Sequence, residues 1–414
     1  MTTTKNNEHK KLNVPNLRFP EFQGEWGKCK LGDIANITGG YAFKSETLNN
    51  IGGKYQVVKM GNLYQNQLDL NRSPSYTDTL TSKAENVILR KGDIAITLTG
   101  TNNKRDFGYT YMFNDEKNLL LNQRCGLIRT KGNNPYFLSC LLKTSAFLNQ
   151  FFESATGGTG NQANVSTKAM EMFSVNIPSF KEQKKIGDLM ALLDERIATQ
   201  NKIIDKLQSL IKGIMVQLQK QGLNKGTWKN VLLSDVLTER KERNTNLYQV
   251  FSVSVSQGVI NQVDYLGRSF AAKDTSKYNV VHYGDLVYTK SPTGSFPYGI
   301  VKQSLNCENV AVSPLYGVYI PDSFSVGAYL HEYFISEMNT QNYLHPLIQK
   351  GAKNTINITN QRFLENRIPM PISSNELSLI SKLLCSLNEK IKYLQNTLQE
   401  YHKQKQYLLC QMFI

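Results

Sequence analysis

The clearest pattern along the chain is an apolar seam whose positions alternate in steps of four and three residues. It occupies ten positions between residues 186 and 218 and recurs in the same register 194 residues later. Such heptad spacing is typical of coiled coils, because it keeps one narrow apolar stripe facing a partner helix. Two long helices are therefore predicted, over residues 181–222 and 375–414. Their main seam residues are Ile186, Met190, Leu193, Ile197, Ile204, Leu207, Ile211, Ile380, Leu384, Leu387, Ile391 and Leu398.

A seam of this length spans about 50 Å as helix, and an apolar stripe so long cannot remain in water. The simplest arrangement buries the two helices against each other as an antiparallel coiled coil within one chain. Polar residues interrupt the seam at different places, Gln200 in the first helix and Lys405 in the second. The alternative is that both are core helices of ordinary domains, which usually carry a wider and less regular stripe.

The chain outside these helices is also duplicated. A Trp-x4-Leu-x-Asp pattern begins at Trp26 and again at Trp228, and each half has a Gly-Asp pair before a short β-like run. A helix predicted over 136–152 is answered by one over 328–343. The expected fold class is α+β, with two similar mixed α/β domains related by a pseudo-two-fold axis. Their predicted boundaries are 21–180 and 223–374, after an N-terminal tail and anchor over 1–20; the long helices separate two globular heads.

Composition favours a soluble protein that binds a polyanion. The 414 residues carry a formal net charge of +15, with 40% apolar and 20% charged residues. Nucleic acid is the partner that such a charge favours, although a basic protein without that role remains an alternative. The sequence has no apolar run long enough for a membrane span and no apolar leader, so neither a membrane span nor a signal peptide is expected. Six cysteines without paired spacing predict reduced thiols and a cytoplasmic location.

Long polar loops in both halves carry side chains suited to DNA. Arginine and lysine bind guanine edges or phosphate, and amides bind adenine. The alternative for each of these loops is that it is an ordinary solvated loop without a binding function. The predicted DNA contacts are Lys44, Lys104, Arg105, Asn161 and Gln162 in the first half and Lys290, Ser291, Thr293, Lys353 and Asn354 in the second.

The motifs that resemble catalytic sites are incomplete. Asn134-Pro135-Tyr136 lacks the second proline of the Asn-Pro-Pro-Tyr motif of amino-methyltransferases and is interpreted as a helix-start turn. The glycine-rich stretch 157–160 lacks the Lys-Ser/Thr of a phosphate loop. The five histidines are scattered and form no metal-binding pattern. The chain is therefore expected to have no catalytic residues, no metal and no cofactor of its own.

The ordered, duplicated set of motifs resembles the specificity subunits of type I restriction–modification systems, from about residue 14 to the end. The repeated Trp-x4-Leu-x-Asp starts carry the resemblance, together with the Gly-Asp elements and the Asn-aliphatic-Ser/Thr stretches. Ile177-Pro178 and Met370-Pro371 before the long helices match as well. The second half departs from the first where Thr238-Glu239-Arg240-Lys241 replaces Gly39-Gly40-Tyr41-Ala42-Phe43-Lys44-Ser45.

The resemblance implies that each head is a target recognition domain for one half of a bipartite double-stranded DNA site. The two helices would act as spacers that set the gap and dock two modification (methyltransferase) subunits. S-adenosylmethionine, ATP and Mg are expected on partner subunits, including restriction (translocase/nuclease) subunits. Phage anti-restriction proteins that mimic DNA are a further partner class. The alternatives are a non-catalytic coiled-coil scaffold or adaptor and a self-contained DNA methyltransferase.

Overall fold

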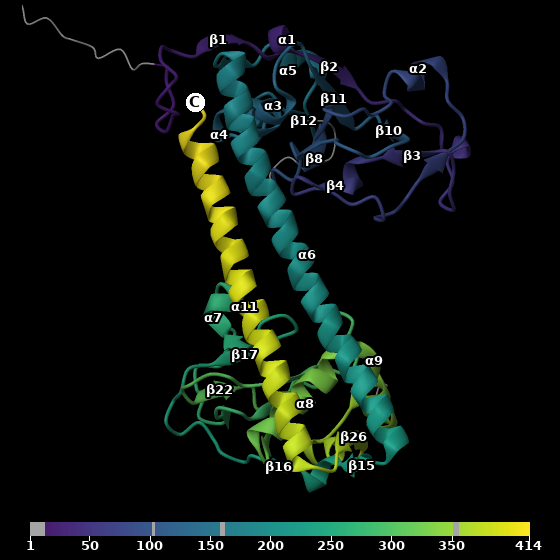
Figure 1. The fold of residues 1–414 in the computed structure, drawn as a ribbon, viewed down its shortest axis with the longest axis vertical. Helices are drawn as coiled ribbons and strands as arrows, with labels where there is room; N and C mark the ends of the chain where they lie inside the picture. Colours follow the sequence, from purple (N-terminus) through teal and green to yellow (C-terminus); the bar gives the residue numbers. More distant parts are fainter. Residues whose placement is uncertain (1–12, 102–103, 158–161, 351–355) are drawn as a thin grey trace, which may run out of the picture. The chain divides into compact units, whose positions relative to one another are not determined.

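The computed structural model describes residues 13–101, 104–157, 162–350 and 356–414. These residues form two compact units. Unit 1 contains the described residues up to Gln200 together with Thr397–Ile414, and unit 2 contains Asn201–Asn396. The long helices α6 (Phe180–Lys225) and α11 (Ser374–Gln411) each contribute to both units (Figure 1). The compact units therefore divide both helices, whereas the predicted domains ended where the helices begin.

Unit 1 is built on a four-stranded antiparallel sheet in the order β2-β11-β7-β9. Its strands are β2 (Ala35–Gly39), β11 (Cys125–Thr130), β7 (Ile94–Thr97) and β9 (Thr110–Met112). All four residues of β7 are buried: the apolar Ile94, Ala95 and Ile96, and the polar Thr97. Helices α3 (Pro135–Leu141) and α4 (Ser145–Glu153) follow β11 and pack into the same core.

Smaller elements complete unit 1. The short sheets are β1-β14, β10-β3-β6, β12-β13-β8 and β4-β5. Their strands are β1 (Gly27–Lys30), β3 (Tyr55–Val58), β4 (Leu63–Tyr64), β5 (Gln67–Leu68), β6 (Tyr76–Thr77), β8 (Thr99–Thr101), β10 (Leu119–Leu121), β12 (Thr156–Gly157), β13 (Gln162–Asn164) and β14 (Ser174–Ile177). The short helices are α1 (Leu31–Ile34), η1 (Ser45–Thr47), η2 (Met60–Asn62), α2 (Ser82–Glu85) and α5 (Thr167–Glu171).

Unit 2 repeats this plan, which confirms the predicted duplication. Its four-stranded antiparallel sheet has the order β16-β23-β20-β21, and helices α8 and α9 follow β23. The strands of unit 2 are β15 (Trp228–Leu232), β16 (Leu237–Glu239), β17 (Phe251–Ser254), β18 (Gly258–Asn261), β19 (Asn279–Val281), β20 (Leu286–Tyr288), β21 (Val301–Gln303), β22 (Val310–Val312), β23 (Gly317–Pro321), β24 (Gln349–Lys350), β25 (Ile356–Asn357) and β26 (Arg367–Pro371). Its helices are η3 (Leu233–Asp235), α7 (Gln262–Leu266), α8 (Phe324–Ile335), α9 (Glu337–Leu344), η4 (His345–Leu347) and α10 (Asn360–Phe363).

The prediction of one helix after each central sheet was wrong, because each is broken in two. The first segment ends at Leu141, and Thr144 starts the second, since its side chain accepts a hydrogen bond from the N–H of Phe147 as an N-cap. Ser336 does the same for α9 by accepting from the N–H of Asn339. A capping side chain competes with helix continuation, and the apolar pattern alone does not show this competition.

The recurring tryptophan makes the same hydrogen bond in both units, from its indole N–H to a glutamate of a long helix. The indole Nε1 of Trp26 donates to Glu182 in the first turn of α6, and that of Trp228 donates to Glu376 in the first turn of α11, at 3.2 and 2.7 Å. Both indoles are 3% exposed. The repeated motif thus fixes the start of each long helix to its own unit.

The seam residues of the long helices are all buried or partly buried. Within unit 1, Ile186, Met190, Leu193 and Ile197 of α6 share one cluster with Leu408 and Met412 near the end of the chain. Within unit 2, Gln219 near the end of α6 and Asn388 in the first half of α11 both bind α8, at Tyr329 and Glu332. Unit 1 therefore contains the beginning of α6 and the end of α11, and unit 2 contains the end of α6 and the beginning of α11. Within the described residues, no helix is both long and apolar enough to cross a membrane.

Candidate nucleic-acid interface

In unit 1, a tight turn brings three distant segments of the chain together. The turn joins β10 to β11, and the N–H of Gln123 donates to the carbonyl of Tyr41 at 3.0 Å. The carbonyl of Arg124 accepts from the N–H of Leu98, also at 3.0 Å. A Cβ on Gly40 would lie 2.1 Å from the carbonyl oxygen of Asn122, so only glycine fits this approach. The side chains of Gln123 and Arg124 are exposed on this turn.

The same surface continues along β8 and β13. Gln162 pairs with Thr101 in the ladder between these strands, and the N–H of Lys104 donates to the carbonyl of Thr101 at 3.1 Å. The structure therefore brings together Lys104, Arg105 and Gln162, which were predicted from separate loops, and all three are exposed.

Local contacts hold this loop in place. The carboxylate of Asp106 accepts from the backbone N–H and the hydroxyl of Thr101, at 2.7 and 3.0 Å. The backbone hydrogen bond from Thr101 lowers the pKa of Asp106, so the carboxylate stays ionised at neutral pH. The guanidinium of Arg105 lies 5.1 Å from the ring centroid of Phe152. Arg105 is thus supported from below by an aromatic ring while its charge remains in solvent.

Lys44 is exposed at the start of η1, where its amine lies 3.6 Å from the carboxylate of Glu46. Asn161, Lys353 and Asn354 lie outside the described residues.

In unit 2, the predicted residues Lys290, Ser291 and Thr293 lie in the turn after β20. Thr293 and Phe296 exchange two backbone hydrogen bonds of 3.0 Å, and Gly299 approaches Lys290 too closely for any side chain. Ser291 is exposed, and the Thr293 hydroxyl donates to its carbonyl at 3.1 Å. Lys290 is only partly exposed; burial lowers its pKa, and the charge of Glu239 partly offsets this effect. Any phosphate bound by Lys290 would therefore compete with Glu239.

In each unit the aspartate of the Gly-Asp motif forms an ion pair with an arginine, Arg129 of β11 in unit 1 and Arg240 after β16 in unit 2. Asp93 accepts from Arg129 at 2.9 Å and from the N–H of Arg90 at 2.8 Å. Asp285 accepts from Arg240 at 2.6 Å and from the N–H of His282 at 2.8 Å. Both aspartates are buried, at 4% and 2% exposure. The Gly-Asp motif is thus a structural anchor at the start of the central strand, at the opposite end of that strand from the candidate surface.

Sequence reasoning missed Gln123 and Arg124. The signal was present as a polar triplet, Asn122-Gln123-Arg124, between the apolar strands β10 and β11. Asn134-Pro135-Tyr136 is a helix start as predicted, since the side chain of Asn134 accepts from the N–H of Phe137 at 2.9 Å. Among the described residues, no three His, Cys, Asp or Glu side chains gather as a metal site.

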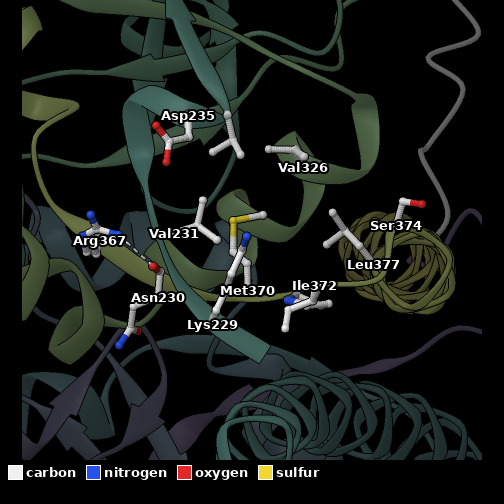
Figure 2. Close-up of a pocket in the computed structure, with 12 residues that line it drawn as sticks. Lys229, Asn230, Val231, Asp235, Val326, Arg367, Met370, Ile372, Ser374 and Leu377 are labelled. Carbon is white, nitrogen blue, oxygen red and sulfur yellow. Dashed lines mark hydrogen bonds between the residues drawn. The ribbon is translucent and has the colours of Figure 1, made fainter. Parts of the chain in front are cut away.

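Unit 2 also has a pocket of about 370 Å³ beside β15, β26 and the start of α11 (Figure 2). Apolar side chains such as Val326, Met370 and Leu377 line it. The guanidinium of Arg367 on its edge donates to the carbonyl of Asn230 at 3.1 Å. None of the predicted DNA contacts lines this pocket, so it is separate from the candidate interface.

Comparisons with known proteins agree with this geometry. A model of the type I restriction modification DNA specificity domain matches residues 23–209. The EcoAI type I restriction enzyme specificity subunit of Escherichia coli is 28% identical over 185 residues, which cover 44% of this chain and 30% of that protein. The putative MjaX specificity subunit of Methanocaldococcus jannaschii is 23% identical over 218 residues, covering 52% and 50%. The aligned regions thus span half or less of these relatives.

Among solved structures, the S subunit of a type I restriction-modification system from M. genitalium shares the fold. It has a TM-score of 0.63 at 12% identity and covers 97% of this chain and 99% of that chain. The fold match extends over both units, whereas the sequence match of the family model lies in the first part of the chain. Residues 23–209 therefore match the type I restriction modification DNA specificity domain in sequence, and the chain as a whole shares the fold of an S subunit.

Proposed function

We propose that each unit reads one half of a split DNA sequence and that α6 and α11 set the gap between the halves. One observation carries this proposal: a single sheet-and-turn scaffold occurs twice in the chain, with different side chains on equivalent turns. A repeated scaffold with diverged loops suits two related but distinct targets, because binding residues concentrate on loops held by rigid elements.

The exposed side chains of unit 1 suit major-groove recognition. Arg105 and Arg124 can bind guanine edges or phosphate, and Gln123 and Gln162 can bind adenine through two hydrogen bonds. In unit 2 the corresponding contacts are Ser291, Thr293 and the less exposed Lys290. The net charge of +15 adds attraction to the phosphate backbone that does not depend on sequence.

The remaining functions belong to partner subunits. The helices would dock two modification subunits, which carry S-adenosylmethionine and turn the target adenine out of the duplex. Restriction subunits would supply ATP- and Mg-dependent translocation and cleavage. In this scheme the chain selects the DNA target sequence and catalyses no step.

Co-expression with the cognate modification subunit, followed by methylation-sensitive sequencing of the host DNA, tests the proposal. The expected result is new methyl-adenine at one motif made of two short half-sites with a constant gap. Methylation at a continuous motif, or a stable complex that methylates nothing, would contradict it.

A coiled-coil adaptor without a DNA function is the second candidate, favoured by the length of α6 and α11 alone. Binding of the complex to DNA at 50 and 200 mM salt separates the two. A protein that neutralises about six to ten phosphates loses roughly 10³–10⁵-fold in affinity over this range. An adaptor shows little DNA binding at either concentration. Binding of S-adenosylmethionine by this chain alone would instead indicate a self-contained methyltransferase.

A further inference from the structure

The end of the chain is part of the core of unit 1. Met412 and Phe413 are 2% and 7% exposed, although the whole segment Asn201–Asn396 that precedes this part of unit 1 belongs to unit 2. Phe413 stacks on Phe137 of α3 with ring centroids 5.1 Å apart, and it meets the edge of Trp26 at 6.3 Å. The carbonyl of Gln411 also accepts from the N–H of Leu17 at 2.8 Å. Unit 1 is therefore completed by residues that follow unit 2 in the sequence.

A polar contact one to two turns earlier fixes the register of this segment. Lys405 stands at a seam position of α11 and pairs with Asp194 of α6, whose carboxylate also accepts from the hydroxyl of Tyr136 in α3. Lys405 and Asp194 have side chains that are only 20% and 33% exposed. A polar pair in an apolar seam costs stability unless it is matched, so it specifies one alignment of the helices.

We propose that Lys405 and the segment 408–413 form a clasp that unit 1 needs in order to hold its DNA-reading turns. This inference rests on the proposed function and extends it, because it assigns positioning residues for the first half-site to the far end of the sequence. Through Phe413, the clasp contacts Phe137 of α3 and Trp26, the residue directly before β1. Helix α3 follows β11, and β11 begins directly after the Gln123–Arg124 turn.

The expected effect of the clasp crosses the order of the sequence, because the clasp residues follow unit 2 in the chain but pack in unit 1. A change at the end of α11 should affect recognition by unit 1 and leave unit 2 unaffected.

The test uses the full chain co-expressed with the modification subunit. The variants are Phe413→Ala and the milder Lys405→Met, and Tyr407→Ala is the matched control because Tyr407 is 60% exposed on the same segment. Hydrogen exchange of the amides of Phe137–Leu141 should become at least tenfold faster in Phe413→Ala, while those of Leu330–Phe334 in α8 should not change. Tyr407→Ala should match the wild type in both segments.

Two further measurements decide the positioning role. Methylation sequencing should show loss or relaxation of one half-site in Phe413→Ala, the same half-site that Arg124→Ala alters, and an unchanged second half-site. The exchanged pair Asp194→Lys with Lys405→Asp should regain recognition that Lys405→Asp alone loses. Equal relaxation of both half-sites, unchanged exchange in α3, or no rescue by the exchanged pair would each overturn the clasp. If the wild type methylates no split motif, the proposed function fails, and the exchange data still decide whether the clasp exists.

Discussion

Units 1 and 2 have equivalent structures along a central strand of the sheet, β7 in unit 1 and β20 in unit 2, up to Thr97 and Thr289. They differ at the residue that follows each of these threonines. The hydroxyls of Thr97 (after Ile96) and Thr289 (after Tyr288) accept from the backbone N–H groups of Tyr109 and Ile300, at 3.0 and 3.1 Å. These donors directly precede β9 and β21. Their offset of 192 residues is also that of Asp93 and Asp285. One position further on, unit 1 has Leu98, which is 6% exposed, and unit 2 has the partly exposed Lys290. The scaffold is constant up to the point where the candidate DNA surface begins.

This difference separates the residues that stabilise the fold from those proposed to recognise the DNA target. Asp93 and Asp285 with their arginines are shared by both units and stabilise the sheets. Gln123 and Arg124 lie between β10 and β11, and unit 2 has Leu315 and Tyr316 in the equivalent turn between β22 and β23. The loop with Arg105 comes after β7 and β8, and unit 2 has Lys290-Ser291-Pro292-Thr293 after β20. Substitutions in the shared set should destabilise either unit alike, and substitutions in the diverged set should alter one half-site.

The largest effect is expected from the shared anchor. Asp93→Ala and Asp285→Ala should each lower the free energy of unfolding by about 3–5 kcal/mol, because each leaves a partly buried arginine without its carboxylate. Urea unfolding measures this loss. Asp115→Ala is the control, since that side chain is 93% exposed and its contact with Lys91 is 3.9 Å long. A loss in one unit and none in the other would break the proposed equivalence.

Acid sensitivity should distinguish the units next. The partly buried Nδ1 of His331 accepts from the N–H of Gln303 at 2.9 Å, and burial lowers its pKa to about 3. The folded protein thus binds this proton less well than the unfolded chain, so stability falls as pH drops below about 6.5. Between pH 7 and 5 the loss is about 2 kcal/mol. Unit 1 has Ser139 at the position 192 residues earlier.

Urea unfolding at the two pH values measures this effect. His331→Gln should reduce the acid-induced loss, whereas His402→Gln, at an exposed position, should leave it as in the wild type. An unchanged pH dependence in His331→Gln would show that other groups cause the acid sensitivity.

Removing a reading arginine should have an intermediate effect. Arg124→Ala or Arg105→Ala should weaken DNA binding, or relax one base position of the first half-site, by about 1–3 kcal/mol. Competition binding with single-base variants of the target measures both outcomes. Lys117→Ala, another exposed cation of unit 1, is the control. Unchanged affinity together with unchanged site preference would remove either arginine from the interface.

The smallest effect is expected from Lys44, which is exposed and near Glu46. Lys44→Ala should weaken binding uniformly across sequences and lower the slope of log affinity against log salt by about 1, as for a phosphate contact. Salt titrations of binding to two unrelated target variants measure this. A loss confined to one base position would instead place Lys44 at a base edge.

The sequence predicted what depends on repetition or periodicity. The heptad seam predicted both long helices, and the repeated tryptophan and Gly-Asp motifs predicted two similar mixed α/β domains. The Gln123–Arg124 turn was missed because its place beside Tyr41 and Leu98 depends on the close approach of Gly40 to Asn122. The partial burial of Lys290 depends on folding around its turn and on Glu239, 51 positions away along the chain. Such long-range contacts leave no local pattern in one sequence.

The most direct test of the central claim is methylation sequencing of host DNA with three versions of the chain beside the modification subunit: wild type, Arg124→Ala, and Ser291→Ala combined with Thr293→Ala. The account predicts a split motif for the wild type. Arg124→Ala should relax one half of it, and the double substitution should relax the other half with an unchanged gap. Changes by both variants in the same half-site, or a motif without two separable halves, would contradict the claim that each unit reads its own sequence.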